Sequence, residues 1–318
     1  KVLLDPYGRA VATGPHYDRA ASTHFGLDNA AYAMKCYCLG EVAGTATTVD
    51  HVRLFRNWPE IRWKYRIHEQ ILPGVRSVKG DVRWADVVIT HVGYADPSAR
   101  KRKVERDLRL LTQEYNEQPE DPFTLFNLGS VYNEIGRPAD AVSYLERSLN
   151  LSHPRDSIVR KLYALIANCR RQLGQPQEAL AACALGREHY PDDEELLFVE
   201  SIIRRERRDF AGAEACLRRL LEGGEGDHFA SVAEGLRGHK ARHHLANLYL
   251  DTARPKEAEA EWRKVLLERP DFLPARSGLG EVFLVGRRWE ELESQAVELE
   301  SFGAVGVEAA EALRGRGK

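Results

Sequence analysis

The segment from Ile61 to Ile71, IRWKYRIHEQI, carries residue types suited to acid–base and anion-binding chemistry. Bulky apolar residues alternate with basic ones from Arg62 to His68, and this period of two predicts a half-buried strand with one cationic face. Glu69 follows the histidine at the end of the strand. Fixed cations stabilise developing negative charge, and a well-placed carboxylate accepts a proton. The alternative is a solvated edge strand whose basic side chains discourage aggregation.

Three other segments with strand-like composition surround this one and would position its side chains. They are AAYAMKCYCLG, TATTVDHVRLFRN, which is rich in β-branched residues, and GDVRWADVVITHVGY, which contains the apolar run Val87–Ile89 expected to be buried. The stretch lacks a sizeable helix, and a sheet needs a covering layer. We therefore expect an incomplete domain here.

Composition narrows the class of protein. The chain has 318 residues, of which 43% are hydrophobic and 30% charged, and it holds no apolar stretch long enough to cross a membrane. Its net charge is −2, which argues against a general nucleic-acid binder. Lys and Arg number 13 against 10 Asp and Glu through Arg100, and 33 against 38 afterwards. The residues through Arg100 and those after it are therefore expected to have different functions.

The five cysteines are odd in number and follow no zinc spacing. Free thiols favour a reducing compartment, so we predict a cytoplasmic protein. Cys36 and Cys38 would share one face of a strand as small apolar core residues, and a redox or metal role is the alternative.

The second half of the sequence repeats with a period near 34 residues. The segment DPFTLFNLGSVYNEIGRPADAVSYLERSLNLSHP has small residues at Gly129 and Ala141, where two helices touch, and large ones at Leu125, Tyr132 and Leu145. This is the tetratricopeptide pattern. It recurs with starts near 122, 160, 194, 239 and 273, and the long third step contains a glycine-rich segment. Such repeats stack into an all-α superhelix with a concave surface, which we expect to bind a protein or peptide.

Two features flank or interrupt the repeats. Val104, Leu108, Leu111 and Tyr115 are spaced as on one face of an amphipathic helix, which would join the N-terminal part to the first repeat. His239 and His243, in HKARHH, have the i, i+4 spacing of a metal-binding pair, but a surface position on the first helix of a repeat is the favoured interpretation.

The order RLFRN, IRW, HEQI, HVGY and DPF, followed by the repeats, resembles the C-terminal part of bacterial family 2 glycosyltransferases fused to tetratricopeptide repeats. That resemblance implies a GT-A fold and sugar transfer, with inversion, from a nucleotide sugar to an acceptor. It also implies a divalent metal, Mn²⁺ or Mg²⁺, on the donor diphosphate.

The resemblance assigns roles to three residues, and the strand alternation adds Arg66. Glu69 matches an acid on the acceptor side, which would take the acceptor proton, and His68 would orient it or touch phosphate. His91 resembles a late histidine near the metal and diphosphate. Arg66 lies on the same predicted strand face as His68 and would contact the cofactor.

The sequence departs from that family in its first part. It holds no Asp-x-Asp motif, and residues 1–25 do not read like the donor-nucleotide half. We therefore expect an α+β chain: a truncated GT-A remnant over 1–97, a connecting helix over 98–121, repeats over 122–306 and a tail over 307–318. As an enzyme fragment it should be inactive alone and hold no metal or nucleotide sugar. The alternative is a non-catalytic tetratricopeptide scaffold.

Overall fold

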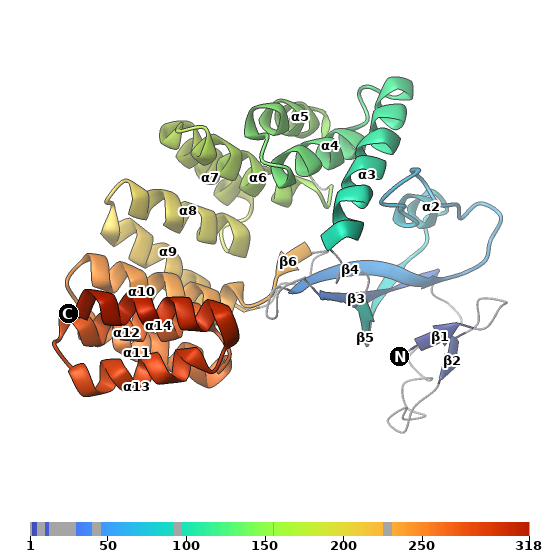
Figure 1. Ribbon diagram of the computed structural model, residues 1–318. Coiled ribbons are helices and arrows are strands. Elements are labelled where there is room, and N and C mark those ends of the chain that lie inside the picture. Colours follow the sequence, from blue (N-terminus) through green and yellow to red (C-terminus); the bar gives the residue numbers. More distant parts are fainter. Residues whose placement is uncertain are drawn as a thin grey trace. The chain divides into compact units, whose positions relative to one another are not determined.

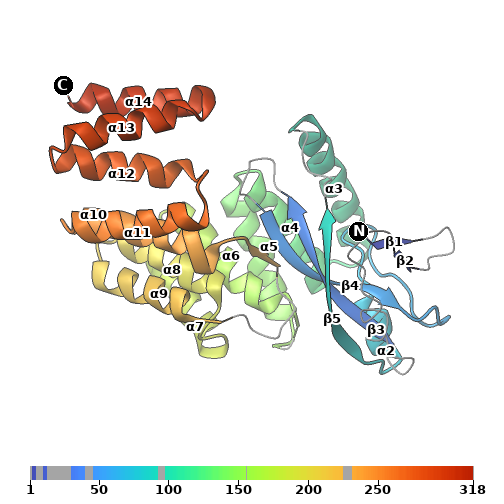
Figure 2. The ribbon, with the colours of Figure 1, turned by 90° about the horizontal axis from the view of Figure 1, so that it is seen from below.

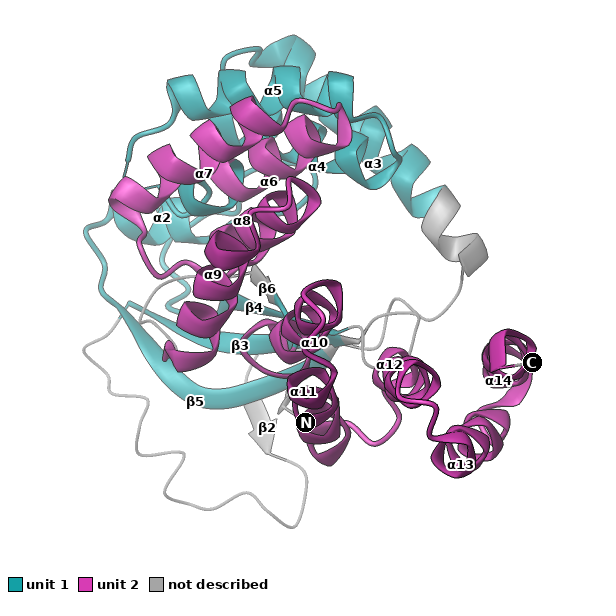
Figure 3. Cartoon of the chain, turned by 90° about the vertical axis from the view of Figure 1, so that its left-hand side faces the viewer, with its two compact units in different colours: residues 1–162, 227–234 teal, residues 163–226, 235–318 magenta. Residues whose placement is uncertain are grey.

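The computed structural model describes residues 2–4, 10–12, 30–39, 46–91, 97–154, 156–224 and 231–317 (Figure 1). They group into two compact units, one of residues 1–162 with 227–234 and one of residues 163–226 with 235–318 (Figure 3). The fold is mostly helical and tetratricopeptide-like, with a small sheet in the first unit. No helix in the described part of the chain has the length and apolar character needed to cross a membrane.

The sheet of the first unit has the order β5-β3-β4-β6, and Figure 2 shows its three longer strands, β3, β4 and β5. Its strands are β3 (Ala31–Leu39), β4 (Ala46–Phe55), β5 (Val82–His91) and β6 (Ser231–Ala233), and a separate pair joins β1 (Val2–Leu4) to β2 (Ala10–Ala12). Strand β3 runs antiparallel to β4 and parallel to β5, while β6 runs antiparallel to β4. The three strands predicted from AAYAMKCYCLG, TATTVDHVRLFRN and GDVRWADVVITHVGY are therefore confirmed.

A short helix, α2 (Leu72–Ser77), packs on this sheet. Its Val75 is fully buried in a cluster with Ala31 and Ala33 of β3 and Val52 of β4. Ile61 and Ile71 belong to the same cluster, so both ends of the predicted cationic strand are fixed in the core.

Two predictions about this part are wrong. Residues 61–71 form an irregular loop and not a strand, because Tyr65 and His68 adopt left-handed φ values of 72° and 54°. A strand requires extended backbone at every position. The run Val87–Ile89 lies in β5 but is not buried, and Val88 is 60% exposed, so the face of β5 that carries Val88 is not covered.

Helices make up most of the remaining described residues. They are α3 (Pro97–Glu117), α4 (Pro122–Glu134), α5 (Pro138–Leu151), α6 (Val159–Gln172), α7 (Pro176–His189), α8 (Glu194–Glu206), α9 (Phe210–Glu222), α10 (Ala241–Asp251), α11 (Pro255–Glu268), α12 (Leu273–Val285), α13 (Trp289–Glu300) and α14 (Gly303–Gly317). In the first unit, α3 packs on α4 through Leu111, Leu128 and Val131, as expected for its amphipathic pattern.

The turns between the two helices of a hairpin share one backbone conformation. A residue with left-handed φ ends the first helix, and the next residue donates its N–H to the carbonyl five positions earlier at 2.7 to 2.9 Å. The left-handed residues are Gly136, Gly174, Arg208, Ala253 and Arg287. Glycine adopts this conformation without strain, whereas Arg208, Ala253 and Arg287 carry a steric cost.

Small residues let the helices approach closely. A Cβ atom at Gly129 of α4 would lie 2.5 Å from Cγ of Leu145 of α5, and one at Gly278 of α12 would lie 2.3 Å from the Trp262 ring of α11. Leu145 and Trp262 are both fully buried. The predicted pairing of small with large residues therefore allows neighbouring helices to pack closely.

The second unit also buries a charge. The Glu200 side chain of α8 is 4% exposed and accepts hydrogen bonds from Arg187 of α7 and Arg204 of its own helix, both at 2.7 Å. A buried carboxylate is tolerated only when its charge is paired.

The repeat region is not all-α as predicted. Residues 231–233 form strand β6, and Leu236–Lys240 form a single π-helical turn that is kinked at Gly238. Both lie in the glycine-rich segment that lengthens the third step. Five glycines between 223 and 240 disfavour a regular helix there.

Candidate functional site

The loop over residues 61–71 is closed by backbone bonds. Lys64 and Gln70 exchange N–H to carbonyl hydrogen bonds at 2.9 and 3.0 Å. Ile67 is buried against Leu111 and Leu128 of the helices that follow. The loop is therefore attached to α3 and α4 inside the first unit.

The cations of this loop meet carboxylates of the same unit. Lys64 Nζ lies 3.4 Å from Asp121, and Arg66 pairs with Glu114 at 3.3 Å and with Glu117 at 2.7 Å. The Asp121 carboxylate also accepts a hydrogen bond from Thr124 N–H at the start of α4. These contacts give the basic side chains a structural role in holding the loop. A role for Arg66 in binding a cofactor stays a prediction.

The other predicted site residues lie on two elements. His68 and Glu69 are adjacent and exposed on the loop. His91 is the last residue of β5, with its backbone opposite Cys38 of β3, and its side chain lies outside the described side chains. In the part of the chain that the structure describes, no three His, Cys, Asp or Glu side chains gather as a metal site would require. The catalytic roles of Glu69 and His68 and the metal role of His91 stay predictions.

The thiols and the histidine pair do not form reactive centres where they are described. Cys36 is buried. Burial raises the pKa of Cys183 to about 12 and that of Cys216 to about 11, so the Cys183 and Cys216 thiols stay protonated at neutral pH. His239 Nδ1 lies 3.2 Å from Glu268, while His243 accepts a hydrogen bond from Trp262 Nε1 at 3.0 Å. The two imidazoles therefore have separate partners and do not make the metal pair that their spacing suggested.

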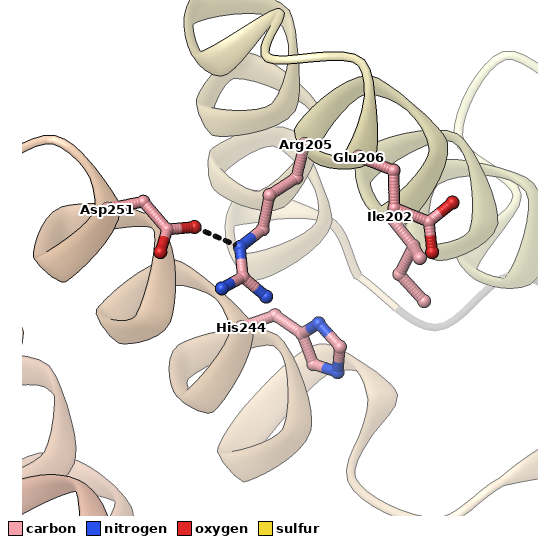
Figure 4. Close-up of a pocket in the computed structure, with 5 residues that line it drawn as sticks. All are labelled: Ile202, Arg205, Glu206, His244 and Asp251. Atoms are coloured by element: carbon pink, nitrogen blue, oxygen red, sulfur yellow. Dashed lines mark hydrogen bonds and ion pairs between the residues drawn. The ribbon is translucent and has the colours of Figure 1, made fainter.

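A pocket of about 240 Å³ lies in the second unit, between the first helices of two successive hairpins (Figure 4). Ile202, Arg205 and Glu206 of α8 form one wall, and His244 and Asp251 of α10 form the other. Sequence reasoning missed this pocket because its residues come from different repeats.

The charges in the pocket are arranged around Arg205. Its Nε donates to Asp251 Oδ2 at 2.5 Å, and one of its two terminal nitrogens lies on the side of His244 (Figure 4). Glu206 is held separately by Arg171 at 2.7 Å. Each acid in the pocket thus has a basic partner, whereas the terminal nitrogens of Arg205 have none among the described residues.

His244 contributes a neutral ring. Burial, helped by the nearby Arg205, lowers its pKa to about 4, so the imidazole is uncharged at neutral pH. Its ring packs edge-on against Phe198 with centroids 4.7 Å apart. The pocket therefore combines a guanidinium edge, a neutral imidazole and the aliphatic wall of Ile202.

Comparisons with known proteins agree with the repeat pattern. A tetratricopeptide repeat family model matches residues 124–158. A TPR repeat-containing protein of Synechococcus elongatus is 26% identical over 135 residues, which are 40% of this chain and 34% of the relative. The chain thus spans about a third of the length of this curated relative.

Two solved structures show the same fold. The type IV pilus biogenesis factor PilW has a TM-score of 0.52 at 14% identity, covering 64% of this chain and 87% of PilW. The Cut9–Hcn1 tetramer structure has a TM-score of 0.53 at 12% identity, covering 67% of this chain and 40% of the matched one. The comparisons give no support for a glycosyltransferase part.

Proposed function

We propose that this protein is a non-catalytic interaction scaffold, and that its second unit binds an extended peptide across α8 and α10. The fold supports this proposal, because stacked helix hairpins expose a row of first helices on which a peptide can lie. The observation that carries it is the pocket at Arg205. A peptide-binding site needs a recess with a few directed polar groups, and this pocket supplies them.

The pocket chemistry favours a carboxylate on the peptide. The free edge of a guanidinium presents two parallel N–H donors, which match the two oxygens of a carboxylate. Neutral His244 adds one further donor without repelling a cation or an anion. The neighbouring acids already have Arg partners, so their charge is partly compensated. We expect an Asp or Glu side chain, or a C-terminal carboxylate, to occupy the pocket.

Selection from a displayed peptide library, followed by calorimetry on the selected peptides, tests this function. Arg205→Ala should weaken binding by about 10- to 100-fold, the usual loss for one charge-assisted hydrogen bond to a buried partner. Arg263→Ala is the matched control, since Arg263 is an exposed, ion-paired arginine of α11 outside the pocket. Equal losses in both variants would count against the site.

A second variant decides the sign of the ligand charge. Asp251→Asn removes a negative charge beside Arg205 and keeps the size of the side chain at position 251. It should tighten binding of an acidic peptide and weaken binding of a basic one. If the selected peptides are basic and lose affinity in this variant, the carboxylate assignment is wrong.

The transferase hypothesis leads to a separate experiment. Titration of the chain with UDP- and GDP-sugars in the presence of Mn²⁺ should show no micromolar binding if the chain acts as a scaffold. Binding that also requires His91 would instead favour the predicted transferase site. A cytoplasmic location is likewise our proposal, and it rests on the free thiols.

A further inference from the structure

Strand β6 is supplied to the sheet from within the repeat region. It comes from the segment GGEGDHFASVAEGLRGHK, residues 223–240, which separates α9 from α10. Val49, Thr48 and Thr47 of β4 face Ser231, Val232 and Ala233 in an antiparallel register. The outer edge of β4 therefore carries a strand that is distant in the sequence.

The hydrogen-bond pattern of this contact can be assigned residue by residue. Glu234 N–H donates to Ala46 O at 2.8 Å, which makes residues 46 and 234 a hydrogen-bonded pair. Because such pairs alternate along an antiparallel ladder, Thr48 and Val232 also form a hydrogen-bonded pair. The N–H of Val49 then points the other way, towards β3.

A side-chain contact adds to the backbone bonds. The hydroxyl of Tyr37 on β3 donates to Glu234 Oε2 at 2.8 Å, across the intervening strand β4. The sheet thus pairs with the backbone of residue 232 and binds the side chain of an acid two positions later.

The strand is short compared with the edge it occupies. It has three residues, whereas β4 has ten, and the rest of the outer edge of β4 has no strand partner in the described ranges. Because β6 belongs to the same chain as β4, it competes for this edge as a tethered ligand, although few bonds hold it.

We propose that the outer edge of β4 is a strand-acceptor site, and that Ser231–Glu234 occupy it as a built-in ligand. The partner that binds when they leave is an extended peptide segment with a β-branched residue followed, two positions on, by an acid. A longer segment forms more ladder bonds along β4 than the three-residue strand does, so it can displace that strand. This site is separate from the pocket at Arg205.

The first test opens the site by substitution. Val232→Pro removes the central N–H donor of β6, and Val232→Thr is the control because it keeps that donor and a β-branched side chain. Hydrogen exchange is followed by NMR at single amides. The Thr48 amide should exchange at least about tenfold faster in the proline variant, while the Val49 amide, which faces β3, stays protected. Unchanged exchange at Thr48 would overturn the proposal.

The second test adds the ligand. The probe is the six-residue peptide ASVAEG, the sequence of residues 230–235 of this chain. It should restore protection at Thr48 in the Val232→Pro variant, and the wild-type chain should need at least about tenfold more peptide because its own strand competes. The peptide ASPAEG should have no effect. Failure of ASVAEG to protect Thr48 at millimolar concentration would show that the edge accepts no strand from outside.

Discussion

Replacing Gly129 by alanine should destabilise this protein, although the same change stabilises most helix interiors. The new Cβ atom would lie 2.5 Å from Cγ and 2.7 Å from Cδ2 of Leu145, and 3.1 Å from the carbonyl oxygen of Ala141. Leu145 is fully buried and cannot move into solvent. Overpacking of this kind costs about 1–3 kcal/mol, whereas the gain in helix propensity is about 1 kcal/mol. We expect a net loss of up to about 2 kcal/mol.

Urea unfolding followed by circular dichroism measures this loss. Gly315→Ala in α14 is the matched control, because a Cβ atom there meets nothing within 4 Å, and it should raise the midpoint. Combining Gly129→Ala with Leu145→Ala should cost less than the sum of the two single variants, since the clash is then absent. If Gly129→Ala raises the midpoint as the control does, the close contact between α4 and α5 is wrong.

Three further predictions concern stability. Ala253→Gly should stabilise the chain by about 0.5–1 kcal/mol, because glycine adopts the left-handed φ of 55° at this position without strain. Gly136→Ala, at a φ of 74°, should destabilise the chain by a similar amount. Urea midpoints measure both changes. Glu200→Ala should cost about 3–5 kcal/mol because two arginines lose their buried partner, and the thermal midpoint should fall far more than for Glu200→Gln. The pKa values of His243 and His244 are lowered from 6.5 to about 4, mainly by burial, so the unfolded chain binds more protons than the native chain in this range. The two neutral histidines therefore contribute fully to the free energy of unfolding above pH 6.5, and this contribution should fall between pH 6.5 and 4 by up to about 3 kcal/mol per histidine. Urea midpoints across this range should change much less in a variant in which both histidines are glutamine.

The repeats could be predicted because their signal is local and recurs. Small residues such as Gly129 stand at a fixed distance from large ones such as Leu145, and each hairpin repeats the spacing. The left-handed turn residue was predictable where it is glycine, as at Gly136. It was not predictable at Arg208, where packing of the two helices forces an unfavourable backbone conformation on an ordinary residue.

The loop at 61–71 shows why a period of two in the sequence is insufficient to predict a strand. The alternation correctly placed Ile67 inside, but it carries no information about the carboxylates of α3 and the start of α4, which come about 50 residues later and pair with the basic side chains. Strand β6 was missed because three residues show no periodicity. The pocket was missed because Arg205 and Asp251 lie 46 residues apart.

The distance in sequence between β4 and β6 affects how the protein is made. Tyr37 and Glu234, which bond across the finished sheet, are 197 residues apart. A ribosome adds about 5–20 residues per second, so the outer edge of β4 waits on the order of 10–40 s for its strand to be synthesised. During that time the growing chain presents an unpaired edge to every neighbouring nascent chain. Slowing translation between these positions should therefore increase aggregation of this protein.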